Sequence, residues 1–192
     1  MKKPVKITIT VLIILILGSI LGVGSAFLSY NWSGKFYNVK NGPWQINLAI
    51  GSETANPYLR AYVAVHGLLA LQQSETIYYS AYTDGDGKLL NADNVYRIEG
   101  KAPDSRWWSI TVYGEDDFLI PNELNRYSYS SNSVSYNSDG KFTIILSKSH
   151  RDGNWLPLGN TKRFSLSLRL YNPGESIRRN PANVELPKII RE

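Results

Sequence analysis

The stretch Phe164-Ser165-Leu166-Ser167-Leu168-Arg169-Leu170-Tyr171 decides the fold class of this chain. A phenylalanine and three leucines occupy every second position, and polar residues or a tyrosine occupy the positions between them. Side chains of a β-strand point alternately to opposite faces, so one face of this strand is expected in a core and the other outside it. Such alternation is typical of antiparallel sheets.

Other segments with a period of two lie before this stretch. They predict strands over residues 77–83, 95–99, 107–113, 133–137 and 142–147. Turn clusters rich in Asp, Gly, Pro and Ser separate them. Residues 44–50 are a possible additional strand, and residues 185–190 are expected as a last edge strand. Short strands at this spacing predict a mainly β protein, an antiparallel, jelly-roll-like β-sandwich.

One hairpin can be predicted in register. A three-residue loop Ser138-Asp139-Gly140, with Gly140 left-handed, would pair Tyr136 with Phe142. A two-residue loop would instead set Tyr136 opposite Thr143. Apolar matching favours the first register.

One soluble helix is expected over residues 57–72. Thr54 is expected to cap it, and Asn56-Pro57 is typical of a first turn, because proline loses no needed donor there. Apolar residues repeat at intervals of three to four on more than one side, so the sheet should largely cover this helix. His66 lies on it and is expected to be a core histidine.

The N-terminal residues 7–28 are apolar or small and carry no charge. A helix of this length covers the roughly 30 Å hydrocarbon core of a bilayer. Lys2, Lys3 and Lys6 precede it, whereas Tyr30 and Trp32 follow where an aromatic belt is expected. We therefore expect a single-pass anchor in a bacterial inner membrane, with a cytoplasmic N-terminus and a periplasmic domain.

The alternative is a cleaved signal peptide, for which Gly24-Ser25-Ala26 offers small residues. The apolar run is longer than the roughly 7–15 residues of a signal core, which favours the anchor. The expected organisation is an anchor over 1–30, a connector over 31–52 and the domain over 53–192. Gly18 and Gly22 would permit helix pairing and hence a homo-oligomer.

Composition excludes several kinds of site. The chain of 192 residues has no cysteine and only two histidines, so thiolate chemistry, iron–sulfur clusters and multi-histidine metal sites are excluded. The net charge of +5 comes largely from lysines near the N-terminus, and no basic stripe indicates nucleic-acid binding. Asp84, Asp86 and Asp93 could hold a calcium ion weakly, but the EF-hand spacing fails at Leu89 and Val95. No metal and no cofactor are predicted.

A series of motifs resembles the bacterial family catalogued as domain of unknown function 1214, over roughly residues 55–175. In chain order they are Trp107-Trp108-Ser109-Ile110-Thr111-Val112-Tyr113, Asp117-Phe118-Leu119-Ile120, Asn125-Arg126-Tyr127-Ser128, Tyr136-Asn137-Ser138-Asp139-Gly140, Asn154-Trp155-Leu156-Pro157 and Leu168-Arg169-Leu170-Tyr171. The resemblance implies a jelly-roll-like sandwich and a short, membrane-tethered, stand-alone member of the family. Gly159 departs from the proline expected in the family's N-W-L-P-x-P loop, and the family brings no established activity.

One strand face suggests a ligand platform. Trp107, Ser109, Thr111 and Tyr113 alternate along one strand, and such a face suits a sugar or another flat ligand. Arginines would add donors for a carboxylate or phosphate. The candidate ligand-binding residues are Trp107, Tyr113, Arg126, Tyr127, Trp155 and Arg169. In the plainer interpretation, these aromatics fill the sandwich and these arginines bind loop carbonyls.

The predicted function is a binding or interaction module of the cell envelope, whose partner is an envelope glycan or a periplasmic protein. The alternative is a metal-independent hydrolase of envelope material that uses His150 and acids such as Glu115, Asp116 or Asp117. No G-x-S-x-G nucleophile elbow is present. The sequence does not identify the catalytic residues of such an enzyme, and it favours a binding module over an enzyme.

Overall fold

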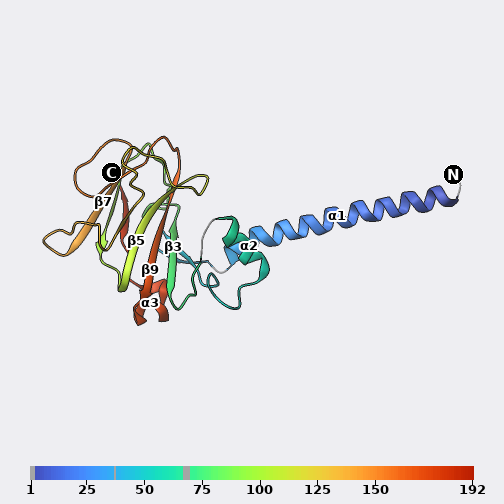
Figure 1. Ribbon diagram of the computed structural model, residues 1–192, viewed down its shortest axis with the longest axis horizontal. Helices are drawn as coiled ribbons and strands as arrows, with labels where there is room; N and C mark the ends of the chain where they lie inside the picture. The colour runs from blue at the N-terminus through green and yellow to red at the C-terminus, as the bar shows by residue number, and fades with distance from the viewer. Residues whose placement is uncertain (1–2, 37, 67–69) are drawn as a thin grey trace.

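The computed structural model describes residues 3–36, 38–66 and 70–192. Figure 1 shows a long N-terminal helix, α1, that projects from a β-sandwich. α1 covers Lys3–Phe36, and its stretch Val5–Ser33 has a mean hydropathy of 2.6. The most apolar part of that stretch is not buried against the rest of the protein. By length and composition this stretch could cross a membrane, and it is consistent with a signal anchor or a signal sequence.

The first sheet has six strands in the order β1-β2-β3-β9-β5-β6. All its neighbouring strands are antiparallel. Its strands are β1 (Asn38–Asn41), β2 (Trp44–Asn47), β3 (Thr76–Ala81), β5 (Ser105–Gly114), β6 (Ser128–Ser130) and β9 (Phe164–Pro173). The possible strand within 44–50 is therefore present as β2.

The second sheet has four strands in the order β10-β4-β7-β8. They are β4 (Tyr96–Lys101), β7 (Lys141–Ser147), β8 (Trp155–Pro157) and β10 (Lys188–Arg191). β7 and β8 are parallel, whereas the other pairs are antiparallel. The expected edge strand near the C-terminus is confirmed as β10. The β-sandwich is confirmed too, but this strand order does not show a jelly roll.

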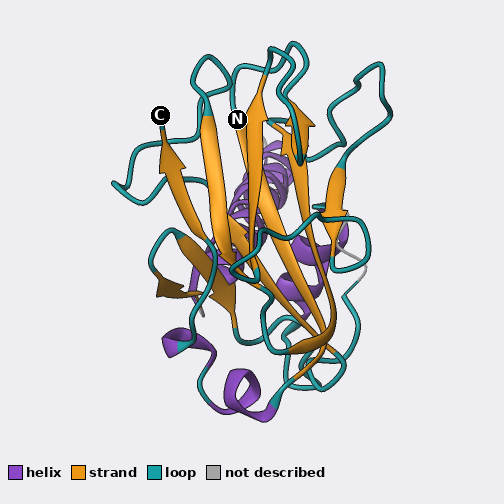
Figure 2. Ribbon diagram, turned by 90° about the vertical axis from the view of Figure 1, so that its left-hand side faces the viewer, coloured by secondary structure: helices purple, strands orange, loops and turns teal. Residues whose placement is uncertain are grey.

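The two sheets share one hydrophobic core. β9 contributes its alternate side chains to it, so Phe164, Leu166, Leu168 and Leu170 are buried while the residues between them are partly exposed. Ile98 on β4 and the alternate apolar residues of β7 contribute from the second sheet. The period of two therefore reports burial correctly in β9 and β7, whereas in β5 the consecutive residues 108–112 are all buried. Figure 2 shows the strands of the sandwich and the helices around them.

The predicted hairpin is partly confirmed. Tyr136 forms an antiparallel bridge with Phe142, and Gly140 has φ +75°. Residues 133–137 nevertheless form no strand beyond this bridge. The carboxamide of Asn154 takes the place of a ladder, because it accepts from Ser135 N and donates to Ser135 O, both at 2.8 Å.

The helix α2 is shorter than predicted and covers Pro57–Val65. Asn56, and not Thr54 as expected, caps it by accepting from Leu59 N at 2.9 Å, and Pro57 begins it as expected. Leu59 is its one buried residue, so the expectation of a largely covered helix is wrong. Residues 67–69 of the predicted helix lie outside the described residues, and residues 70–72 are not helical. Two short helical segments, α3 (Glu175–Arg179) and η1 (Pro181–Asn183), precede β10.

Candidate functional site

The outer face of the first sheet carries polar and aromatic side chains between β5 and β9. The register places Ser109 opposite Arg169 and Tyr113 opposite Ser165. At the other end of this face, the ring of Trp107 lies edge-on to Tyr171 with centroids 5.1 Å apart. The aromatic and hydroxyl-bearing face predicted from the sequence therefore exists, and Trp107 and Tyr113 lie at its opposite ends.

Arg169 is half-buried at the centre of this face. Its Nη1 donates to Thr111 Oγ1 at 2.9 Å, and its Nη2 donates to Tyr113 OH at 2.5 Å. The guanidinium carbon also lies 5.6 Å from the centroid of the Tyr113 ring. No carboxylate of the described residues lies within 4.0 Å of this cation. Arg169 is thus held by neutral groups and carries an uncompensated positive charge.

The helix α2 and this sheet face enclose a cleft of about 130 Å³. α2 contributes one wall, the end of β3 and the turn after β5 contribute the rim, and β9 forms the floor. The lining residues are Ile50, Tyr62, Val63, His66, Ser80, Tyr82, Tyr113, Asp117, Ser165, Leu166, Ser167 and Arg169. The cleft therefore combines apolar and aromatic walls with a few polar groups, the composition usual for small-molecule sites.

His66 lies at the rim of this cleft and is not the core histidine that we expected, since a third of its side chain is exposed. Its ring stacks on Tyr62 with centroids 4.0 Å apart. Nδ1 lies 2.8 Å from Tyr62 O, so the ring N–H donates to this carbonyl. In the neutral ring, Nε2 is then the free acceptor, and it lies 3.9 Å from Asp117 Oδ2.

Asp117 reaches the cleft from the turn that follows β5. Its φ of +61° is the left-handed conformation, which Asp and Asn adopt more readily than most residues. Burial, and then the Tyr82 and Asp117 charges, raise the pKa of Tyr62 to about 12. Burial and Asp117 likewise raise the pKa of Tyr82. Both phenols therefore keep their protons at neutral pH and offer O–H donors.

Three of the predicted ligand-binding residues lie elsewhere. Arg126 donates to Trp155 O at 3.3 Å and lies over the ring of Tyr129, 5.7 Å from its centroid. Trp155 is buried, and its indole N–H donates to the main chain and hydroxyl of Ser147. These contacts join the edge of the first sheet, at β6, to the edge of the second, at β8.

Tyr127 belongs to the same corner, because its hydroxyl donates to Asn125 Oδ1 at 3.0 Å. Asn122 closes the corner by accepting from Arg126 N and donating to Arg126 O. The plainer interpretation thus suits Arg126, Tyr127 and Trp155. Of the six predicted residues, the structure brings only Tyr113 and Arg169 together in the cleft.

The proposed acid–base pair around His150 is not supported. His150 is exposed, and its ring lies edge-on to Trp155 with centroids 4.9 Å apart. No carboxylate lies within 4.0 Å of it in the part of the chain that the structure describes. The histidine that does approach a carboxylate is His66.

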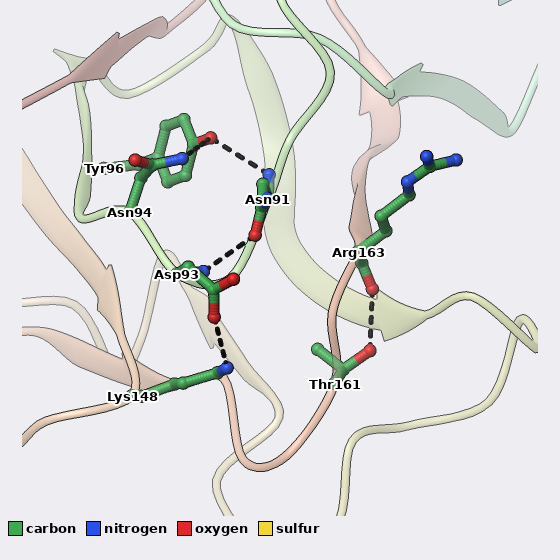
Figure 3. A network of polar contacts seen from close by, with 7 residues as sticks. All are labelled: Asn91, Asp93, Asn94, Tyr96, Lys148, Thr161 and Arg163. Atoms are coloured by element: carbon green, nitrogen blue, oxygen red, sulfur yellow. Dashed lines mark hydrogen bonds and ion pairs between the residues drawn. The ribbon is translucent and has the colours of Figure 1, made fainter.

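Two of the aspartates considered for calcium, Asp84 and Asp93, make local contacts, although Asp84 Oδ2 is buried without a hydrogen-bond partner among the described residues. Asp84 Oδ1 accepts from the main-chain nitrogens of Asp86 and Lys88, which is a turn. Asp93 pairs with Lys148 at 2.7 Å, as Figure 3 shows within the polar network around the Tyr96 hydroxyl. No group of three or more potential metal ligands occurs among the residues described.

Comparison with known proteins places the chain in a family. The model of "Protein of unknown function (DUF1214)" matches residues 75–175. The crystal structure of the VPA0106 protein from Vibrio parahaemolyticus is similar, with 27% identity, a TM-score of 0.60 and coverage of 72% of this chain. This chain spans only 36% of that protein.

An uncharacterized protein from Burkholderia cenocepacia gives 17% identity and a TM-score of 0.46, over 61% of this chain and 29% of the other. No curated protein matches the chain significantly. The family match covers all strands from β3 to β9, including Tyr113, Asp117 and Arg169, whereas α2 lies before it. The family resemblance that the motifs indicated is confirmed: the chain belongs to the DUF1214 family, whose function is unknown.

Proposed function

We propose that the protein is a membrane-anchored, extracytoplasmic binding module of the cell envelope, and that its ligand occupies the cleft between α2 and the first sheet. The observation that carries this proposal is the uncompensated charge of Arg169 on the cleft floor. A half-buried cation without an acid partner is costly to the fold. A ligand that supplies the missing anion removes this cost, so the site favours an anionic group.

The membrane attachment in this proposal comes from α1. Residues 7–28 would span the bilayer and residues 1–30 would form the anchor, with the connector over 31–52 and the domain over 53–192. The lysines at the N-terminus and the apolar, exposed helix support an N-terminus in the cytoplasm of a bacterial cell. The domain is then periplasmic.

The ligand in this proposal has an anionic group and an apolar or flat part. Arg169 can still donate to an oxyanion, because two of its five N–H groups serve Thr111 and Tyr113. The rings of Tyr62, Tyr82 and Tyr113 offer apolar area with hydroxyl groups at their ends. An acidic envelope glycan or an acidic group of a periplasmic protein fits these features.

The test is equilibrium binding by the full chain in detergent micelles. The ligands are an oligosaccharide that contains uronic acid, a neutral oligosaccharide of equal length and a short acidic peptide. We expect Arg169→Met to weaken binding of the acidic ligands at least tenfold, since a hydrogen bond to a charged group contributes about 1.5–3 kcal/mol.

The matched control is Arg151→Met, which removes the same charge from an exposed loop. It should leave affinity unchanged. Equal affinity of Arg169→Met and the native chain for every ligand that binds would refute the proposed site.

A further inference from the structure

We infer that the ligand of this cleft is a phospholipid with a zwitterionic headgroup, its phosphate at Arg169 and its ammonium at Asp117. This inference rests on the proposed function and deepens it. It follows from three features that the cleft combines: separated opposite charges, a contact with the outer end of α1, and an adjoining apolar groove.

The charges in the cleft are of both signs and are not paired with each other. Arg169 has no carboxylate within 4.0 Å among the described residues, and Asp117 has only the Nε2 of His66, at 3.9 Å. A guanidinium fits phosphate oxygens well because its planar donors match their geometry. A ligand that is both anionic and cationic satisfies both groups, whereas a simple anion would lie close to the Asp117 carboxylate.

Aromatic rings surround the carboxylate end of the cleft. Tyr62 and Tyr82 line the cleft with Asp117, and the Asp117 charge acts on both phenols. The Tyr62 ring is stacked on His66, so Tyr82 is the ring that can interact with an ammonium group beside the carboxylate. The aromatic walls therefore favour a cationic group at the same end as Asp117.

The cleft lies beside the point where α1 leaves its apolar stretch. Tyr30 of α1 packs on Tyr62 of α2 with ring centroids 5.6 Å apart, and Tyr62 is a wall of the cleft. The apolar stretch Val5–Ser33 ends three residues later. If α1 spans the bilayer, Tyr62 lies at the level of the lipid headgroups, where tyrosines are enriched. The cleft is thus within reach of a membrane lipid.

A second cavity adjoins the cleft along α2. It has a volume of about 610 Å³ and shares the side chains of Ile50 and Val63 with the cleft. Its walls come from α2 and the segments on either side of it. They are mostly apolar, with Ala49, Ala55, Leu59, Ala64, Ala70 and Leu71, but Glu53 and Arg60 also line the cavity. A polar cleft next to an apolar groove suits a headgroup and part of an acyl chain, so it favours a lipid over a soluble zwitterion.

The experiment is native mass spectrometry of the full chain released from detergent micelles. Each sample contains one probe at equal concentration: phosphatidylethanolamine, phosphatidylglycerol of the same acyl chains, or soluble glycerophosphoethanolamine. The variants are Arg169→Met and Asp117→Asn, because asparagine also tolerates the positive φ. Arg151→Met and Asp152→Asn are the matched controls on an exposed loop.

We expect the native chain to bind phosphatidylethanolamine at least tenfold more tightly than the other two probes. Arg169→Met should lower the affinity for both lipids at least tenfold. Asp117→Asn should lower the affinity for phosphatidylethanolamine alone, so that the preference over phosphatidylglycerol disappears. Both controls should bind like the native chain.

Several outcomes would overturn the inference. Equal binding of the two lipids would refute the zwitterion, and equal binding of glycerophosphoethanolamine would refute the lipid source. Lipid binding that Arg169→Met leaves unchanged would place the lipid outside the cleft. If no phosphate probe binds but the uronic-acid oligosaccharide does so through Arg169, this inference fails and the proposed function stands; if neither binds, both fail.

Discussion

Replacing Arg169 by methionine separates a ligand-binding role of this residue from a structural one. Methionine keeps a long, unbranched side chain that can pack on the Tyr113 ring, and it removes the charge and the donors. Replacement of a residue that mainly supports the fold should lower the free energy of unfolding. Replacement of a residue that serves binding and destabilises the fold should lower the affinity for the ligand instead.

The expected change in stability is small because two opposing contributions are of similar size. The two hydrogen bonds from the guanidinium, at 2.9 and 2.5 Å, contribute about 1.5–3 kcal/mol each before solvent exposure is considered. Solvent reaches this half-buried group and reduces that contribution. Removal of the unpaired cation recovers a desolvation penalty, which solvent exposure likewise reduces below the several kcal/mol of a fully buried ion. We therefore expect the free energy of unfolding to change by no more than about 1 kcal/mol, a shift in Tm of about 2–4 °C.

The assay is thermal unfolding of both chains in the same micelles, followed by circular dichroism, together with the binding measurement on the same samples. We expect an almost unchanged Tm and a loss of affinity of at least tenfold. A fall in Tm of more than about 10 °C would show that Arg169 is mainly a structural residue. That result would refute the argument from its uncompensated charge.

Three further predictions concern stability. Asn154→Ala removes the buried carboxamide that holds Ser135 and should cost about 2–3 kcal/mol in urea unfolding; a cost below 0.5 kcal/mol would contradict this role. Gly159→Ala should cost at least about 1 kcal/mol, because φ is +48° and a Cβ would lie 2.8 Å from Pro121 O; a more stable variant would refute it. Burial raises the pKa of Tyr62 above its value in the unfolded chain, so stability should fall as pH rises from 10 towards 12. Tyr62→Phe should reduce that fall, and an unchanged pH dependence of the urea midpoint would contradict the prediction.

Much of the sandwich could be predicted because its strands follow a period of two. The alternation in β9 identified both its core face and its outer face, and Gly140 with the Tyr136–Phe142 bridge followed from turn geometry. The same reasoning wrongly predicts a strand over residues 133–137. A side chain from another loop, Asn154, pairs with their main chain, and no local pattern indicates such a contact.

The candidate site could be predicted only where one strand pair forms it. Tyr113 and Arg169 lie on one sheet face, and alternation places them there. The apolar neighbours of His66 on the helix indicate a core position, whereas its side chain lies at the cleft rim and is one third exposed. The carboxylate near it belongs to Asp117, which is distant in sequence and has a left-handed backbone conformation in a turn. Only the packing of α2 against the first sheet brings the two side chains together. The sequence signal for this site was the position of Asp117 in the turn that follows the strand β5.

The most direct test of the central claim, that the cleft between α2 and the first sheet is a binding site, uses protein extracted from its own membranes without added ligand. Native mass spectra of the native chain, Arg169→Met and Arg151→Met are compared. We predict a retained small molecule on the native chain and on Arg151→Met, and its loss from Arg169→Met. The same retained molecule on all three proteins, or none on the native chain, would contradict the claim.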